Sequence, residues 1–368
     1  MGKKIYKLCV IILVLIMVML CACEKKKDKK EEETKETNKD IIKIGMSFDS
    51  FVVERWRKDA DVFTSKIKDY YGDAEVNIQN ANGNASDQVA QIEYLIESKV
   101  DVLVIVCINS ESLSGVIEKA KKAGIPIIAY DRLISNANVD LYISFDNYKV
   151  GEEMAEALYK AGLPGKKVLM LPGPDEDNNV AMVCEGFKKV MEEKGVRIVD
   201  SYSVENWDSL KAKAYIEHLY NDTEVLDSID GIMCGNDAIA TSVIRTLSEL
   251  RMTNKNIKVV GQDADIEACQ RIVEGTQLMT VYKPVETLAS TAADYAIDLA
   301  RNHKLDDVGG TIYDGKDEVP YKCLDIIAVD KDNMDETVIK SGFHLYDDVY
   351  YNVNKKKKTT EETTKNGN

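Results

Sequence analysis

Short apolar runs alternate with amphipathic stretches along most of this chain, and this alternation limits its fold more than any other feature. The apolar runs fall at residues 42–46, 74–78, 102–106, 126–130, 167–171, 231–233, 257–261 and 278–281. Helical patterns lie between them, among them residues 52–71, 86–98, 111–123 and 148–161. Buried runs that alternate with helices predict an α/β fold of three layers, with mainly parallel sheets covered on both faces.

The pattern occurs in two blocks, which predicts two lobes. The first block covers about residues 41–147, and the second begins with the helical pattern after Asn147. A chain of 368 residues is long for one hydrophobic core and sufficient for two. Ligands of such sheets bind at the carboxyl ends of the strands, so we expect a cleft where the two carboxyl edges face each other.

Residues 1–23 resemble a bacterial lipoprotein signal. Lysines precede an apolar run at residues 8–20, which is too short to span a bilayer easily and leads into Leu-Cys-Ala-Cys. Cleavage would leave Cys23 as a lipidated N-terminus, and two or more acyl chains would anchor it stably to the membrane. The alternative is an uncleaved single-span anchor. Both place the globular part outside the cytoplasm, as on a Gram-positive cell surface.

The regions that flank the two blocks are charged. Residues 24–40 carry almost no apolar side chains, so we expect a disordered tether there. Residues 346–368 contain a lysine run at 355–358 and predict a disordered tail. The formal charge of −15 argues against nucleic acid as a partner, because nucleic-acid binding requires basic surface.

The spacing of cysteine and histidine predicts no metal site, no cofactor and no catalytic triad. The mature body would keep cysteines at residues 107, 184, 234, 269 and 323, without a CxxC pair. We expect them to be small buried side chains, and the spacing leaves a disulfide between two of them open. The histidines at 218, 303 and 344 are scattered along the chain.

Polar side chains follow the buried runs, and the segment 124–151 gives the clearest case. The run at 126–130 leads directly into Asp131 and Arg132. A carboxylate acceptor beside a guanidinium donor suits a ligand whose hydroxyls both donate and accept, namely a sugar. The alternative is an ordinary structural ion pair.

The other strand ends supply further candidates. They are Arg55, Trp56, Asn179, Trp207, Asn236, Asp263 and Lys283. The alternatives are a solvated helix charge at Arg55, helix capping by an asparagine at 178 or 179, and core packing of the tryptophans. An indole face also suits the C–H face of a sugar ring. Because polar or aromatic groups recur at so many strand ends, we favour a shared sugar site.

Segments between residues 42 and 344 carry a resemblance to a known family. They read KIGMSFDS, ERW, QNANGN, QIEYLIESKVDVLVI, AYDRLISNANVDLYISFDNYKVG, DNN, GND, GQDADIEACQRIVEGTQLMTVYKP and ETVIKSGFH. With these segments the chain resembles the D-xylose-binding protein family, which belongs to the ribose-binding-like periplasmic receptors of ABC sugar importers. It departs from the family pattern at residues 174–177 and 180–184, which concern one wall of the expected pocket.

The resemblance implies a periplasmic binding protein-like type I fold, in which three crossovers join the lobes as a hinge. The implied N-terminal lobe comprises residues 41–147 and 281–322, and the C-terminal lobe comprises 148–280 and 323–345. Carried over by position, the implied polar contacts to a sugar are Arg55, Asp131, Arg132, Asn179, Asn236, Asp263 and Lys283, and the implied stacking residues are Trp207 and Trp56. Asn178 is left as the helix cap.

The resulting hypothesis is a monomeric lipoprotein, not an enzyme, that captures a monosaccharide, D-xylose, by hinge closure and delivers it to an ABC permease. An alternative with the same pocket is a lipid-anchored sensor that signals to a histidine kinase or chemoreceptor. A glycosidase using Asp131 and Asp263 is disfavoured, because basic neighbours would keep both carboxylates ionised. A sugar-responsive repressor would need a basic helix-turn-helix at the N-terminus, where this chain has a signal and a tether.

Overall fold

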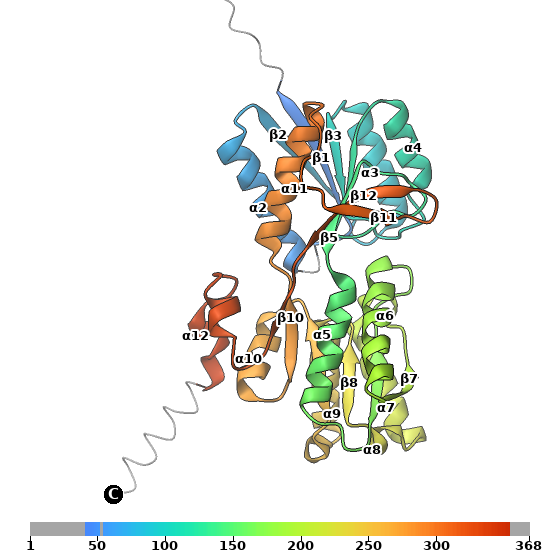
Figure 1. The fold of residues 1–368 in the computed structure, drawn as a ribbon, viewed down its shortest axis with the longest axis vertical. Helices are drawn as coiled ribbons and strands as arrows, with labels where there is room; N and C mark the ends of the chain where they lie inside the picture. Colours follow the sequence, from blue (N-terminus) through green and yellow to red (C-terminus); the bar gives the residue numbers. More distant parts are fainter. Residues whose placement is uncertain (1–40, 52–53, 354–368) are drawn as a thin grey trace, which may run out of the picture. The chain divides into compact units, whose positions relative to one another are not determined.

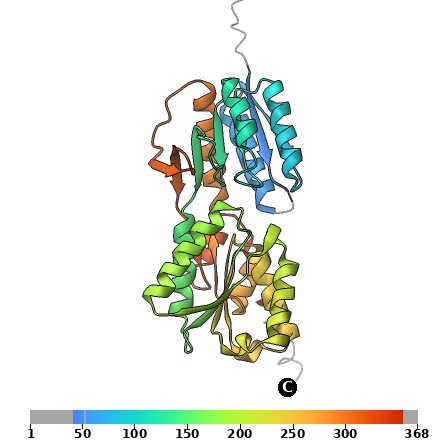
Figure 2. The same ribbon diagram turned by 90° about the vertical axis from the view of Figure 1, so that its right-hand side faces the viewer.

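The computed structural model describes residues 41–51 and 54–353 (Figures 1 and 2). Apart from Ile41, these residues belong to one compact unit that begins at Ile42. The predicted signal, Cys23, the tether at 24–40 and the tail from 354 onward lie outside the described residues. Within the described ranges, no helix combines the length and the apolar sequence that a membrane span requires.

The first lobe is built on a seven-stranded sheet with the order β11-β12-β5-β4-β3-β1-β2. The strands are β1 (Ile42–Phe48), β2 (Ala74–Asn80), β3 (Val102–Ile105), β4 (Ile127–Tyr130), β5 (Leu141–Phe145), β11 (Gly310–Tyr313) and β12 (Glu318–Leu324). All neighbouring pairs are parallel except the antiparallel β11–β12 pair. The three central strands β3, β4 and β5 are buried along their whole length, as expected for a sheet covered on both faces.

Helices cover both faces of this sheet (Figure 1). Helices α2 (Glu54–Tyr70) and α11 (Val285–Ala300) pack against one face through an apolar cluster that includes Phe63. Helices α3 (Ala85–Glu97) and α4 (Ser114–Lys122) pack against the other face through Leu95 and its neighbours. The lobe therefore has the three layers predicted from the alternating pattern.

The second lobe repeats this arrangement with a six-stranded sheet of order β13-β10-β9-β8-β6-β7. Its strands are β6 (Lys167–Leu171), β7 (Arg197–Ser201), β8 (Gly231–Cys234), β9 (Lys258–Gln262), β10 (Met279–Tyr282) and β13 (Ile327–Val329), and only β13 runs antiparallel to its neighbour. Helices α5 (Asn147–Lys160) and α6 (Asn178–Glu193) pack on one face, and α7 (Ser209–Asp222) and α9 (Asp237–Glu249) pack on the other.

Two glycines allow α5 and α6 to pack with their backbones in close contact. A Cβ atom at Gly151 would lie 1.9 Å from the carbonyl oxygen of Val183, and a Cβ at Gly186 would lie 2.0 Å from that of Tyr148. No side chain larger than hydrogen fits at either position without moving a helix. This contact fixes α6, whose first turn reaches the cavity between the lobes.

The chain crosses between the lobes three times, each time through a short segment. Residue 146 joins β5 to α5, residues 283–284 join β10 to α11, and residues 325–326 join β12 to β13. The predicted fold class, with two α/β lobes and three crossovers, is confirmed.

Several predicted boundaries differ from the structure. Strand β10 belongs wholly to the second sheet, so the first lobe resumes with α11 rather than at residue 281. Cys323 and Leu324 pair with Ser144 and Phe145 of β5 and so belong to the first sheet, not the second. The pattern analysis also missed β7, β11, β12 and β13, because these strands are short of buried apolar residues and partly exposed. Of these, β7, β11 and β13 are edge strands.

The prediction of a disordered tail from residue 346 is wrong for residues 346–353. Helix α12 (Tyr346–Val349) lies beside α10 (Ile266–Glu274), and Val349 is buried in a cluster shared with that helix. The side chain of Gln270 donates to the carbonyl oxygen of Asp348 at 2.8 Å. Composition alone did not predict this helix, because two of its four residues are acidic.

Candidate functional site

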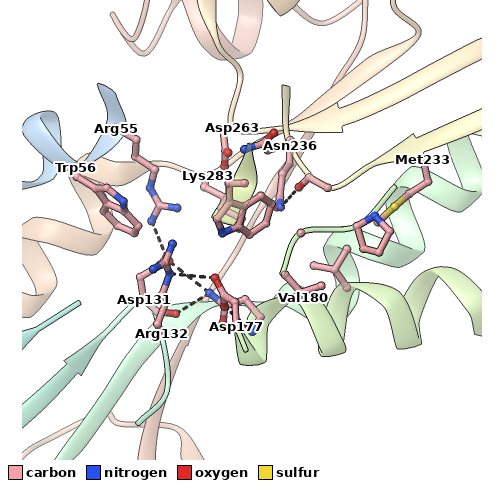
Figure 3. Close-up of a pocket in the computed structure, with 17 residues that line it drawn as sticks. Arg55, Trp56, Asp131, Arg132, Asp177, Val180, Met233, Asn236, Asp263 and Lys283 are labelled. Carbon is pink, nitrogen blue, oxygen red and sulfur yellow. Dashed lines mark hydrogen bonds and ion pairs between the residues drawn. The ribbon is translucent and has the colours of Figure 1, made fainter. Parts of the chain in front are cut away.

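A cavity lies between the two lobes, and side chains of both lobes line it (Figure 3). The space between the lining atoms, including the part open to solvent, is about 600 Å³. The lining includes every predicted sugar contact, namely Arg55, Trp56, Asp131, Arg132, Asn179, Trp207, Asn236, Asp263 and Lys283. The structure therefore brings the predicted side chains together, and their contact with a sugar stays a prediction.

Asp131 sits at the end of β4 in a left-handed backbone conformation, with φ of 63°. Its N–H donates to Ile143 of β5 at 2.8 Å, and its carbonyl oxygen accepts from Ser144 Oγ at 2.7 Å. Its carboxylate accepts from Arg55 Nη2 at 2.5 Å. Burial alone would raise the pKa of Asp131, but the charges of Arg55 and Lys283 outweigh burial and hold it below its usual range. Asp131 is therefore an ionised acceptor at neutral pH.

Asp263 repeats this geometry in the second lobe. It follows β9 with φ of 97°, and its N–H donates to Val281 of β10 at 2.9 Å. The next residue, Ala264, is also left-handed, and its N–H donates to Thr280 Oγ1 at 3.1 Å. The same hydroxyl donates to the buried carboxylate of Asp237 at 2.7 Å. Asp237, which the sequence analysis did not single out, thus supports the turn that presents Asp263.

Arg132 connects the lobes. Its Nη1 donates to Asp49 Oδ2 at 2.7 Å within the first lobe, and its Nε lies 3.0 Å from Asp177 Oδ2 of the second lobe. Only 8% of Arg132 is exposed, so these charges interact with little screening by solvent. In Figure 3, Arg132 and Asp177 point toward each other at the base of the cavity.

The prediction that Asn178 caps α6 is wrong, because Asp177 is the cap. The side chain of Asp177 accepts from the N–H of Asn179 at 3.0 Å. Asn178 instead begins the helix, and its side chain donates to Ser135 Oγ of the first lobe at 3.2 Å. Aspartate is among the best cap residues, so the pattern Asp-Asn-Asn before a helix was a signal that the sequence analysis overlooked.

Asn179 also bridges the lobes. Its side-chain Nδ2 donates to the carbonyl oxygen of Asp131 at 3.0 Å, and its Oδ1 accepts from Tyr142 at 3.2 Å. Together with Arg132 and Asp177, this contact shows that the lobes meet directly around the cavity.

Trp56 is both a core residue and a wall of the cavity. It is 3% exposed and packs near Phe48, at 6.4 Å between ring centroids. The guanidinium of Arg55 lies 4.5 Å from the centroid of its ring, and that of Arg132 lies 5.6 Å away. Both distances suit a cation–π interaction. The indole therefore holds two cationic donors in place beside the cavity.

Lys283, Asn236 and Gln262 complete the polar lining. Lys283 donates to Asn147 Oδ1 at 3.1 Å, which links two of the crossovers, and its burial lowers its pKa although Asp263 and Asp131 act to raise it. Asn236 caps α9 by accepting from Ile239 at 2.9 Å. Gln262, which was not predicted, donates to Gly235 at 2.5 Å, while its buried Oε1 has no partner among the described residues.

Trp207 lies on the second-lobe side of the cavity, in the 3-10 turn at Glu205–Trp207. Its ring packs directly on Gly173, where a Cβ atom would lie 2.3 Å from Cη2 of the indole. The side chain is partly exposed, unlike Trp56. The two tryptophans thus contribute apolar surface from different lobes.

We predict that Gly173→Ala weakens sugar binding by about tenfold, because the new methyl group must displace the indole of Trp207. Titration calorimetry measures the affinity, and tryptophan fluorescence reports the displacement, since the chain has only two tryptophans. Gly115→Ala is the matched control because a Cβ there has nothing within 4 Å. Equal affinity of the Gly173→Ala variant and the wild type would contradict the stacking role of Trp207.

The site as a whole combines charged, amide and aromatic side chains. Guanidinium, ammonium, carboxylate and amide groups line the cavity together with two indoles. Among the described residues, no group of three or more His, Cys, Asp or Glu side chains is placed to hold a metal ion. Such a lining matches a neutral polyol, whose hydroxyls donate and accept and whose C–H faces are apolar.

Comparison with known proteins agrees with this architecture. Residues 44–304 match the periplasmic binding protein domain family. The chain is 42% identical to a D-xylose-binding periplasmic protein of Haemophilus influenzae, over 85% of this chain and 93% of that protein. A second D-xylose-binding periplasmic protein, from Escherichia coli, is 40% identical over 82% of this chain and 91% of its own length. The chain belongs to the D-xylose-binding protein family.

Solved structures place this member of the D-xylose-binding protein family among sugar receptors of the same fold. An ABC transporter solute-binding protein from Clostridium phytofermentans with bound β-D-glucose is 28% identical and superimposes with a TM-score of 0.74. The match covers 83% of this chain and 99% of that one.

Proposed function

We propose that this protein captures D-xylose in the cavity between its lobes and delivers it to an ABC sugar permease. The observation that carries the proposal is the lining of this cavity, which combines charged donors and acceptors from both lobes with an indole from each. A sugar that contacts both lobes favours the closed arrangement, because only that arrangement offers both sets of partners.

The family supports D-xylose over other monosaccharides. Two relatives of at least 40% identity are D-xylose-binding proteins, and the charged contacts carried over from the family resemblance all line the cavity. A sugar that lacks one of the bound hydroxyls would leave a buried charged group without a partner. We further infer that the chain works outside the cytoplasm as a monomer and is held at the membrane by a lipid on Cys23.

Titration calorimetry against xylose, ribose, arabinose, galactose and glucose tests this proposal. We expect xylose to bind tightest, with each mismatched hydroxyl weakening binding by about 1–3 kcal/mol. Heat-denatured protein serves as the control for dilution effects. Tighter binding of any other sugar in the panel would refute the assignment to xylose, and no binding of any of the five would refute the proposed function.

A further inference from the structure

A buried carboxylate, Asp59, lies behind the cavity without lining it. Asp59 is on α2, one turn after Arg55, and is 0% exposed. A carboxylate this deeply buried is unusual unless it has a paired partner or a specific role. Neither the fold nor the proposed sugar contacts account for it.

Asp59 faces two groups that shape the site. The hydroxyl of Tyr130, the last residue of β4, donates to its Oδ1. Its Oδ2 lies 3.6 Å from Nε of Arg55. Neither this Oδ2 nor Arg55 Nε makes a hydrogen bond to any described residue. The two atoms form a long ion pair that is buried and therefore little screened by solvent.

These contacts connect Asp59 to Asp131, the proposed sugar acceptor, by two routes. Arg55 donates to the carboxylate of Asp131, and Tyr130 is the residue that precedes Asp131 in the chain. Asp59 therefore contacts both groups that position the Asp131 carboxylate. These are Arg55, which pairs with that carboxylate, and Tyr130, which precedes Asp131 at the end of β4. Asp59 itself is not among the residues that line the cavity.

We propose that Asp59 is a positioning residue for sugar binding: as a carboxylate it holds Arg55 in place beside Asp131, and its protonation weakens the affinity for the sugar. The proposal rests on the proposed function for its ligand.

The surroundings of Asp59 bring its protonation into the neutral pH range. Burial raises its pKa to about 7, although Arg55 on its own helix and the Tyr130 hydroxyl on β4 act to lower it. The other charges that face it, Asp131 after β4 and Asp263 after β9, raise it further. The ionised form is the one that holds Arg55, so affinity is complete above this pKa and falls as the pH drops through it.

The Asp59→Asn variant tests the role directly. Asparagine keeps the shape and can still accept from Tyr130, but it carries no charge toward Arg55. We expect sugar binding at pH 8 to be about tenfold weaker and to stay constant between pH 6 and pH 8, whereas wild-type affinity falls with acidification. By linkage, a tenfold difference between the two protonation states means that bound sugar lowers the pKa of Asp59 by about one unit.

Two further variants make the test specific. Asp61→Asn removes an exposed carboxylate from the same helix and should keep the wild-type affinity and pH profile. Tyr130→Phe removes the hydrogen bond that lowers the pKa of Asp59, so the pH dependence should remain while its midpoint moves to higher pH. If Asp59→Asn binds sugar like the wild type at both pH values, the proposal is overturned.

The Nε–H signal of Arg55 in ¹⁵N NMR of the unliganded protein separates this proposal from the proposed function. We expect the signal to titrate near pH 7 in the wild type and to lose this titration in Asp59→Asn. A signal that is insensitive to pH in the wild type overturns the positioning role. This holds even if no sugar in the panel binds, an outcome that by itself refutes only the proposed function.

Discussion

Replacement of Asp131 by alanine is expected to weaken sugar binding at least about a hundredfold. The change removes an ionised acceptor from the cavity and leaves the partly buried Arg55, whose Nη2 lies 2.5 Å from this carboxylate, without its main partner. Truncating one partner of a buried, hydrogen-bonded charge pair at a binding site costs about 2–5 kcal/mol of binding free energy, and about 1.4 kcal/mol corresponds to a tenfold change in affinity. Titration calorimetry measures the loss, and thermal unfolding shows whether the variant is folded.

The Asp131→Asn variant distinguishes the effect of losing the carboxylate charge from the effect of straining the backbone. Asparagine tolerates the left-handed conformation at φ of 63°, whereas alanine does not adopt it readily. We therefore expect the asparagine variant to melt closer to the wild type while still binding sugar more weakly. Binding by the alanine variant within about threefold of wild type would show that Asp131 is not a sugar contact, because loss of a charge-assisted hydrogen bond exceeds that change.

Asp177→Asn should weaken sugar binding by roughly ten- to a hundredfold through its effect on closure. Asparagine is as good a helix cap as aspartate, so α6 keeps its first turn, but the charge opposite Arg132 is lost. Because this pair joins the two lobes at 3.0 Å, its removal disfavours the closed state. The apparent affinity for the sugar then falls in proportion to the population of the closed state.

Small-angle X-ray scattering measures this effect as a larger radius of gyration of the variant at a sugar concentration that closes the wild type. Asp175→Asn is the matched control, because Asp175 is an exposed carboxylate in the same loop. A variant that binds weakly but shows wild-type scattering without sugar and at saturation would assign Asp177 to sugar contact instead of closure.

Much of the fold could be predicted because its central strands are buried on both faces. The runs at 102–106 and 126–130 correspond closely to β3 and β4, whose residues are all buried. The strand ends then predicted which side chains lie together around the cavity, since parallel strands place their final residues along one edge. Asp131 and Asp263 were recognisable for this reason, although they come from different lobes.

The supporting residues could not be predicted, because their roles arise from tertiary contacts. Asp59 interrupts an amphipathic helix and looks like any solvated helix charge, yet Tyr130 from a distant strand makes it a buried partner of Arg55. Asp237 likewise resembles an ordinary acidic residue in a first helical turn, where it also suits the helix dipole. The local sequence pattern does not show which strand covers such a side chain in the folded protein.

The left-handed backbone at Asp131 and Asp263 also limits how this receptor can change over evolutionary time. At φ of 63° and 97°, side chains other than Asp, Asn and Gly carry a conformational strain of about 1–2 kcal/mol before any ligand is considered. Lineages that acquire a new sugar therefore have few tolerated substitutions at these two positions. New specificity should arise instead at lining positions with ordinary backbone, such as Val180.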